Sequence, residues 1–305
     1  VSMIAASALE IAESLSRIAR QSELPWGGMR VIVVGDFAQL PPVTRTGQKR
    51  EWTFESPTWQ QSGFQVVELT HSHRSFDQDF LDVLKDVRVG KVTDIVKQYL
   101  SSRMMEHDES DDITRLFPRR DQAEYLNQKK LSQIHNPEVR IPSIYIGESK
   151  LVEALKRNSP IADEIVLKVG CQVLFLQNDP QKRWVNGTRG TVVEIHPEKI
   201  VIEKETWRHV TVEKTQFSLQ DATGKTVASV INFPLTLAYA TTIHKSQGST
   251  LDDLWVDLSR LWEPGHAYVA LSRLRLGSGL RLLGWSHRSI MADSAVLKFY
   301  QNLKN

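Results

Sequence analysis

The stretch VIVVGDFAQLPP, residues 31–42, most narrows the folds open to this chain. Its apolar start at 31–34 predicts a buried strand, and Asp36 and Gln39 place polar side chains directly after it. The two prolines that follow fix φ and remove backbone donors, so neither a helix nor a central strand can continue. Ligands of open α/β sheets bind beyond the carboxyl ends of the strands, so this stretch is a candidate site in an α/β protein.

Two interpretations of this stretch stay open on its residues alone. Gly-Asp after an apolar strand is typical of the Mg²⁺-holding strand of a P-loop NTPase, and also of a strand that simply ends in a turn. The amide of Gln39, held rigid by the prolines after it, favours a contact with a phosphate.

The rest of the chain alternates helical and strand patterns around one β-rich stretch. Apolar spacing predicts an opening helix over 4–18, and apolar runs predict strands at 65–69 and 235–240. Short apolar runs separated by Gly and Asn-Gly turns predict a small inserted β-barrel at about 170–234. The acidic run at 107–112 is interpreted as a solvated loop.

Charge and composition exclude several classes of protein. Lys and Arg number 38 against 36 Asp and Glu, so a site for a polyanion must be local. The single cysteine, Cys171, rules out a disulfide framework and is interpreted as a core residue. No apolar run is long enough to span a bilayer, and the opening VSMIAASALE lacks the pattern of a secretory signal.

A second candidate site is the segment TTIHKSQGST, residues 241–250, which follows a predicted strand. Its Thr, Ser and Gly residues indicate a helix start whose free N–H groups can bind phosphate, and Lys245 adds positive charge. The plain alternative is a Thr/Ser helix cap beside a surface lysine.

Two arginines complete the candidate set. Arg273 comes near the end of the predicted helix AYVALSRLR, and Arg74 follows the predicted strand QVVEL. Each has an ordinary explanation, because an arginine can complement a helix dipole or form a surface ion pair.

The order of these motifs resembles that of the superfamily-one DNA helicases, specifically the Pif and RecD group. The resemblance rests on GDFAQLPPV, L-T-x-x-x-R, NGTRGTV, LTLAYATTIHKSQGSTL and YVALSRLR, and covers almost the entire chain. The family usually has Gln where Ser75 follows Arg74.

The resemblance implies an α/β fold of RecA-like P-loop NTPase domains that close on MgATP, with single-stranded DNA lying across them. It implies that residues 1–75 belong to an incomplete first domain, that 76–169 and 235–305 form the second, and that 170–234 are an inserted Src-homology-three-like barrel. The implied ATP-binding residues are Gly35, Asp36, Gln39, Arg74, Gln247, Gly248 and Arg273, among which Gln39, Arg74 and Arg273 are catalytic. The implied DNA-binding residues are Thr241, Thr242, His244, Lys245 and Ser246.

The Walker A loop and the Walker B acids of such a motor are missing from the sequence. The GKT at 224–226 lacks the required Gly five residues earlier, where Leu219 stands, so it is interpreted as a turn. The opening Val-Ser-Met matches the residues that follow Walker B in the family, so the chain looks cut just after those acids.

The leading expectation is an ATP-dependent, 5′ to 3′ DNA helicase of replication, repair or recombination, located in a nucleus, a mitochondrion or a bacterial cytoplasm. These 305 residues alone should bind ATP poorly and hydrolyse none, and they lack the Mg²⁺ ligands. The alternative is a non-catalytic module, derived from a helicase, that binds single-stranded DNA or a protein. An in-frame Walker A and Asp-Glu pair upstream of Val1 would favour the helicase.

Overall fold

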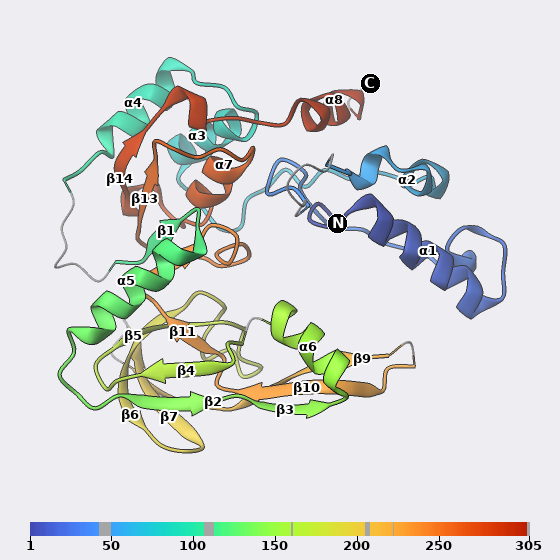
Figure 1. Ribbon diagram of the computed structural model, residues 1–305. Coiled ribbons are helices and arrows are strands. Elements are labelled where there is room, and N and C mark those ends of the chain that lie inside the picture. The colour runs from blue at the N-terminus through green and yellow to red at the C-terminus, as the bar shows by residue number, and fades with distance from the viewer. Residues whose placement is uncertain (43–49, 107–112, 160, 205–207, 222, 304–305) are drawn as a thin grey trace. The chain divides into compact units, whose positions relative to one another are not determined.

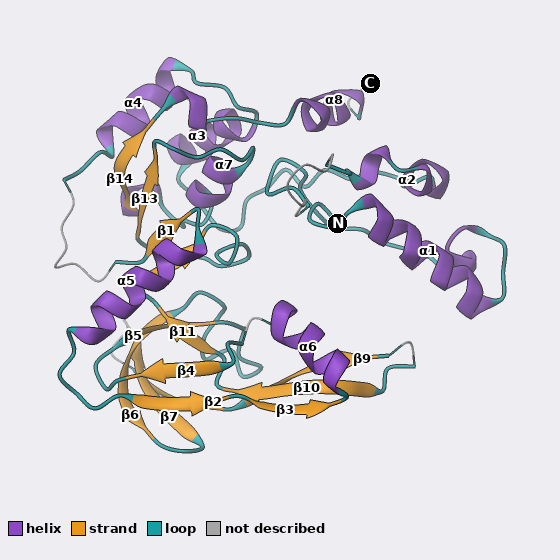
Figure 2. Cartoon of the chain, viewed as in Figure 1, coloured by secondary structure: helices purple, strands orange, loops and turns teal. Residues whose placement is uncertain are grey.

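The structure is a computed structural model that describes residues 1–42, 50–106, 113–159, 161–204, 208–221 and 223–303. The predicted acidic loop at 107–112 lies outside the described residues. The chain divides into two compact units: residues 1–106 with 256–305, and residues 107–255. Figure 2 shows that the first unit is mainly helical and that the second is mainly strand.

The first unit combines the two ends of the chain (Figure 1). Its elements are α1 (Ala6–Arg20), α2 (Pro57–Ser62), α3 (Gln78–Arg88), α4 (Asp94–Ser102), α7 (His266–Leu271), β14 (Leu280–Trp285) and α8 (Ser294–Asn302). Helices α3 and α8 begin at the caps Asp77 and Asp293, whose carboxylates accept hydrogen bonds from backbone N–H groups of the first turn. These caps fix where the two helices start.

The second unit holds most of the strands. Its strands are β1 (Arg115–Phe117), β2 (Val139–Pro142), β3 (Ile144–Gly147), β4 (Glu164–Leu167), β5 (Gln172–Phe175), β6 (Arg189–Ile195), β7 (Lys199–Lys204), β8 (His209–Glu213), β9 (Thr215–Gln220), β10 (Thr226–Asn232), β11 (Leu235–Leu237) and β12 (Ala240–Thr242). Its helices are α5 (Arg120–Ser132) and α6 (Ser149–Asn158). Gly224 and Lys225 of the GKT lie in the turn between β9 and β10, as the sequence predicts, and Thr226 begins β10; Gly224 has φ +83°.

A parallel pairing confirms the α/β class. Strand β1 pairs in parallel with β12, in a sheet of order β12-β1-β13-β14. The division between the two units falls inside β13 (Leu254–Leu258), after Trp255. This sheet is of the kind that RecA-like domains carry.

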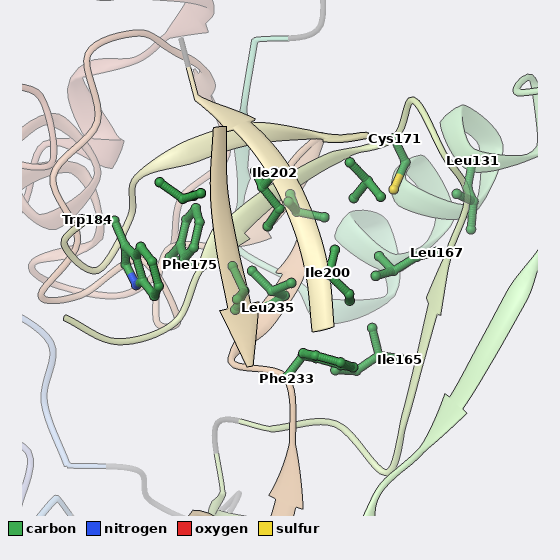
Figure 3. Close-up of a cluster of buried hydrophobic side chains, with 14 residues drawn as sticks. Leu131, Ile165, Leu167, Cys171, Phe175, Trp184, Ile200, Ile202, Phe233 and Leu235 are labelled. Atoms are coloured by element: carbon green, nitrogen blue, oxygen red, sulfur yellow. The ribbon is translucent and has the colours of Figure 1, made fainter. Parts of the chain in front are cut away.

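A five-stranded antiparallel sheet of order β11-β5-β6-β7-β8 lies mostly within residues 170–234, the segment predicted as an inserted barrel. Buried and exposed residues alternate along β8, so Val210 and Val212 face Ile202 and Ile200 of β7. In the resulting core, Phe175 and Trp184 lie at one end and Cys171 at the other (Figure 3). Cys171 is fully buried, which confirms the prediction that it is a core residue.

The segment 235–240, predicted as one strand, divides between two strands that belong to different sheets, β11 and β12. Its first part, β11, pairs antiparallel with β5, whereas β12 pairs in parallel with β1. Ala238 and Tyr239 make the passage and are buried. The Ala238 N–H donates to the Gln172 carbonyl, and its own carbonyl accepts from the Thr114 hydroxyl. The main chain therefore changes partners at this point, and one apolar run serves both sheets.

Two strand predictions in residues 1–75 are wrong, and the helix prediction is confirmed. Helix α1 forms where predicted, but Ile11, Leu15 and Ile18 of its apolar face are 58 to 72 % exposed. The segments 31–34 and 65–69 are not strands, and Ile32 and Leu69 are more than 80 % exposed. A strand needs a neighbour to satisfy its N–H and C=O groups, and the part of the chain that the structure describes supplies none for either segment.

Candidate functional site

The GDFAQLPP segment ends in a tight turn that presents Gln39. The backbone N–H of Gln39 donates to the Asp36 carbonyl at 3.1 Å, and the Ala38 N–H donates to the Asp36 carboxylate at 3.1 Å. Phe37, Ala38 and Leu40 are buried on either side, while Gln39 is half-buried. The turn thus anchors its apolar residues and leaves the amide at its tip.

The Asp36 carboxylate binds two side chains that sequence reasoning did not single out. Arg88, the last residue of α3, donates to both of its oxygens, at 2.9 and 3.4 Å. The Tyr300 hydroxyl of α8 donates to Asp36 Oδ1 at 2.9 Å and accepts from the Phe37 N–H at 2.9 Å. The Arg88 guanidinium also lies over the Tyr300 ring, 4.6 Å from its centroid. One carboxylate therefore joins three segments that are far apart in the sequence.

Aromatic packing holds α8 against the same turn. Phe37 lies edge-on to the rings of Trp52, Phe54, Trp59 and Phe299, with centroids 4.9 to 6.0 Å away. Phe299 of α8 also stacks on Phe54 at 4.4 Å. Edge-on and offset-stacked pairs are the favoured aromatic geometries, so this cluster fixes α8 beside the turn.

Gly265, the residue before α7, allows that helix to approach the Gln39 turn. It has φ +85°, and a Cβ at this position would lie 2.3 Å from the Gln39 carbonyl oxygen. No side chain fits there. The backbone of the predicted γ-phosphate sensor is therefore packed directly against the start of the helix that precedes Arg273.

Arg74 and Arg273 lie together. The Arg74 guanidinium donates to the Ser272 carbonyl at 2.6 Å, and that of Arg273 donates to the Ser272 hydroxyl at 2.9 Å. Arg273 also donates to the Val269 carbonyl at 2.8 Å and is 2 % exposed. Arg273 follows α7, which ends at Leu271, instead of lying within the predicted helix.

The pKa values of both guanidinium groups of this pair are lowered. Burial lowers the pKa of both guanidinium groups, and the neighbouring Arg74 lowers that of Arg273 further, to about 10. Both groups stay charged at neutral pH. Two adjacent buried cations favour the binding of an anion, since an anion offsets both their repulsion and their lost hydration.

Tyr268 of α7 connects the two clusters electrostatically. Burial raises the pKa of its hydroxyl, and the negative charge of Asp36 raises it further, while Arg88 and Arg273 act in the opposite direction. The sequence places Tyr268 on a buried helix face, and the structure shows it half-buried.

Ser75, where the family usually has Gln, is buried, and its hydroxyl accepts a hydrogen bond from the Asp77 N–H at 3.2 Å.

The second candidate site, in the other unit, is a hydrogen-bonded turn at 243–248 that follows β12. The helix start predicted here is wrong, because no helix forms between β12 and β13. The Thr242 hydroxyl accepts from the Lys245 N–H, and the Ser246 hydroxyl donates to the Ile243 carbonyl. Thr242 and Ser246 are buried and hold the turn, whereas Lys245 is exposed.

The surroundings of this turn are basic on one side and tightly packed on the other. Partial loss of hydration and the nearby Arg120 lower the pKa of Lys245, and Glu124 opposes them. Thr241 and His244 are half-buried, as is Gln247, and Gly248 has φ +87°. Gly187, in the NGTRG motif, packs so closely that a Cβ there would lie 2.9 Å from Ser249 Cβ.

Across the described ranges, no group of three His, Cys, Asp or Glu side chains could hold a metal ion. No helix in these ranges combines the length and apolar character needed to cross a bilayer.

Comparisons with known proteins agree with this arrangement. Residues 1–98 match the family model for PIF1-like helicases, and residues 150–195 match that for the 2B domain of the DNA helicase Pif1. The chain is 60 % identical over its whole length to the ATP-dependent DNA helicase Pif1 of Bdellovibrio bacteriovorus, of which it covers 69 %. It spans about half the length of the vertebrate relatives that it matches.

Solved structures give the same result. The whole chain matches 74 % of a Bacteroides Pif1 in complex with ADP-AlF4, with a TM-score of 0.86 and 27 % identity. It matches the same share of a Bacteroides Pif1 bound to single-stranded DNA, with a TM-score of 0.71. The RecA-like helicase fold expected from the motifs is thereby confirmed, and the chain belongs to the PIF1-like family of ATP-dependent DNA helicases.

Proposed function

We propose that this chain carries the phosphate-sensing and DNA-gripping parts of an ATP-dependent DNA helicase that moves 5′ to 3′ on single-stranded DNA. The observation that carries the proposal is the pair of Arg74, which is half-buried, and Arg273, which is buried. Both guanidinium groups donate hydrogen bonds to Ser272. Phosphoryl transfer depends mainly on positioning and on stabilising the charge of the transferred group. Two guanidinium groups at one point supply that stabilisation.

The residues of the first unit fit the terminal phosphate of ATP. Arg74 and Arg273 would act as arginine fingers, and Gln39 would sense the γ-phosphate, with Gly35 and Asp36 shaping its turn. Bound Mg²⁺ would neutralise charge on the phosphates. The roles that the resemblance gives to Gln247 and Gly248 at the nucleotide remain predictions.

The turn at 241–248 would hold the DNA backbone. Thr241, His244 and Lys245 would contact phosphates, while Thr242 and Ser246 keep the turn in shape through hydrogen bonds of their own. A similar Pif1 has been solved with single-stranded DNA bound, which supports this partner. Contacts to phosphates carry no sequence information, so binding should be indifferent to sequence and weaken with salt.

The domain organisation follows as part of the same proposal. Residues 1–75 would belong to the first RecA-like domain, 76–169 with 235–305 to the second, and 170–234 to the inserted barrel. The five-stranded sheet formed by β11, β5, β6, β7 and β8 supports the last assignment.

The proposal is tested by comparing two forms of the protein. The natural full-length protein should hydrolyse ATP when single-stranded DNA is added and should unwind duplexes with a 5′ tail. The 305 residues alone should bind single-stranded DNA without hydrolysing ATP, because their sequence holds no G-x-x-x-x-G-K-[ST] loop. The Arg273→Ala variant of the 305 residues is the control. Hydrolysis that persists in this variant would come from a contaminant, whereas hydrolysis that the substitution removes would contradict the expectation. A natural protein that binds DNA and never hydrolyses ATP would instead be the non-catalytic module.

Lys245→Gln should weaken the binding of a fluorescent oligo-dT to the 305-residue chain about three- to tenfold, and should lower the slope of log affinity against log salt by about 0.7. The reason is that Lys245 places an exposed positive charge on this turn, in a chain whose net charge is only +2. Lys225→Gln, at an exposed lysine in the turn between β9 and β10, is the matched control and should change neither quantity. Equal effects of the two substitutions would remove the turn from the DNA-binding site.

A further inference from the structure

The Asp36 carboxylate is held by three protein groups. It accepts hydrogen bonds from Ala38 N–H within the turn, from Arg88 at the end of α3, and from the Tyr300 hydroxyl of α8. The Asp36 carbonyl also accepts a hydrogen bond, from the Gln39 N–H. Asp36 therefore contacts the turn with both its main chain and its side chain.

The position of Gln39 is constrained from both directions along the chain. Before it, the Tyr300 hydroxyl holds the Phe37 N–H and the Asp36 carboxylate at the same time. After it, two buried prolines fix the main chain. The Gln39 carbonyl lies against the backbone of Gly265, so the turn cannot move towards α7. The Asp36 contacts therefore bear on the main chain of the turn that carries the Gln39 side chain.

We infer that Asp36 is a positioning residue for the Gln39 amide, and that Arg88 and Tyr300 are the groups through which α3 and the C-terminal helix α8 set the place of that amide. This inference rests on the proposed function, because it assigns these residues to the γ-phosphate sensor. The inference makes α8 a part of the nucleotide site, although this helix begins 255 residues after Gln39.

The electrostatics agree with these roles. Burial lowers the pKa of Arg88, but the hydrogen bonds and charge of Asp36 outweigh burial and raise it overall. Burial and the charge of Asp36 both raise the pKa of the Tyr300 hydroxyl. Both shifts favour a charged Arg88 and a neutral, hydrogen-donating Tyr300 beside the Asp36 carboxylate.

The test uses Tyr300→Phe and Asp36→Asn in the natural full-length protein, and measures the affinities for a non-hydrolysable ATP analogue and for ADP. If Asp36 and Tyr300 position the γ-phosphate sensor, each substitution should lower the affinity for the ATP analogue about tenfold and leave that for ADP unchanged. The ratio of analogue affinity to ADP affinity then falls about tenfold, which is the effect of losing one charge-assisted hydrogen bond. The double variant should lose less than the sum of the two single losses, because the substitutions share the contact between the Tyr300 hydroxyl and the Asp36 carboxylate.

Two further variants make the outcomes distinguishable. Tyr145→Phe is the matched control, since the Tyr145 hydroxyl also binds a carboxylate, Asp163, and its ring also carries a cation, Lys156. It should leave the ratio unchanged. Gln39→Ala should lower the ratio if the proposed function is correct. A ratio that falls with Gln39→Ala but not with Tyr300→Phe or Asp36→Asn overturns the inference alone, whereas a ratio unmoved by Gln39→Ala overturns the proposed function.

Discussion

Arg273→Ala should lower ATP turnover by the natural full-length protein about 10³-fold or more, which is the range measured for arginine fingers. The Arg273 guanidinium is 2 % exposed, is fixed by Val269 and Ser272, and lies beside Arg74. Its contribution is to the charge that develops during transfer, so KM for ATP should change much less than kcat. Steady-state hydrolysis in saturating single-stranded DNA measures both constants.

Arg275→Ala is the matched control, because Arg275 lies two residues further along and is exposed. It should retain turnover within about twofold, as most surface substitutions have small effects. Arg74→Ala should resemble Arg273→Ala, and the double variant should lose little more than either, since the two guanidinium groups would act on one phosphate. A fall in turnover that tracks a loss of folded protein, measured by circular dichroism, would count against this role.

Gly265→Ala should destabilise the chain by about 3 kcal/mol or more, because it combines an unfavourable backbone conformation with a clash against main-chain atoms. The added Cβ would lie 2.3 Å from the Gln39 carbonyl oxygen and 2.9 Å from that of Ala38. Since neither atom belongs to a flexible side chain, the turn itself must move. Chemical denaturation of the 305-residue chain measures the change in the free energy of unfolding.

Gly224→Ala separates the two causes. Gly224 has φ +83°, almost the value of Gly265, but no atom lies within 4 Å of its added Cβ. It should therefore cost only the backbone term, about 1 to 2 kcal/mol. The difference between the two variants measures the steric term, and equal costs would show that the Gln39 turn is not held against Gly265.

Local sequence patterns predicted which helices and strands form better than they predicted which other segments those elements pack against. Helix α1 begins and ends close to its predicted positions, yet its apolar face is exposed, because periodicity reports which face could be buried and not what lies there. The run at 31–34 has the composition of a strand but no pairing partner among the residues described. Pairing depends on the tertiary fold, which a local pattern does not contain.

The candidate site shows the same limit. Arg74 and Arg273 could be predicted because their motifs are local, and the structure brings both to Ser272. Arg88 and Tyr300 could not, since an arginine at a helix end ordinarily complements the dipole and a tyrosine in a terminal helix ordinarily packs. Their role appears only through contacts with Asp36 across 52 and 264 residues.

The passage between β11 and β12 has a mechanical consequence. A hinge needs main-chain groups that can rotate freely, but here the only two intervening residues are buried, and Gln172, Thr114 and Arg115 bind their backbone groups. A displacement of the five-stranded sheet is consequently expected to move the turn after β12 with it. If the turn after β12 holds single-stranded DNA as proposed, a shift of the bound strand would move the five-stranded sheet with it.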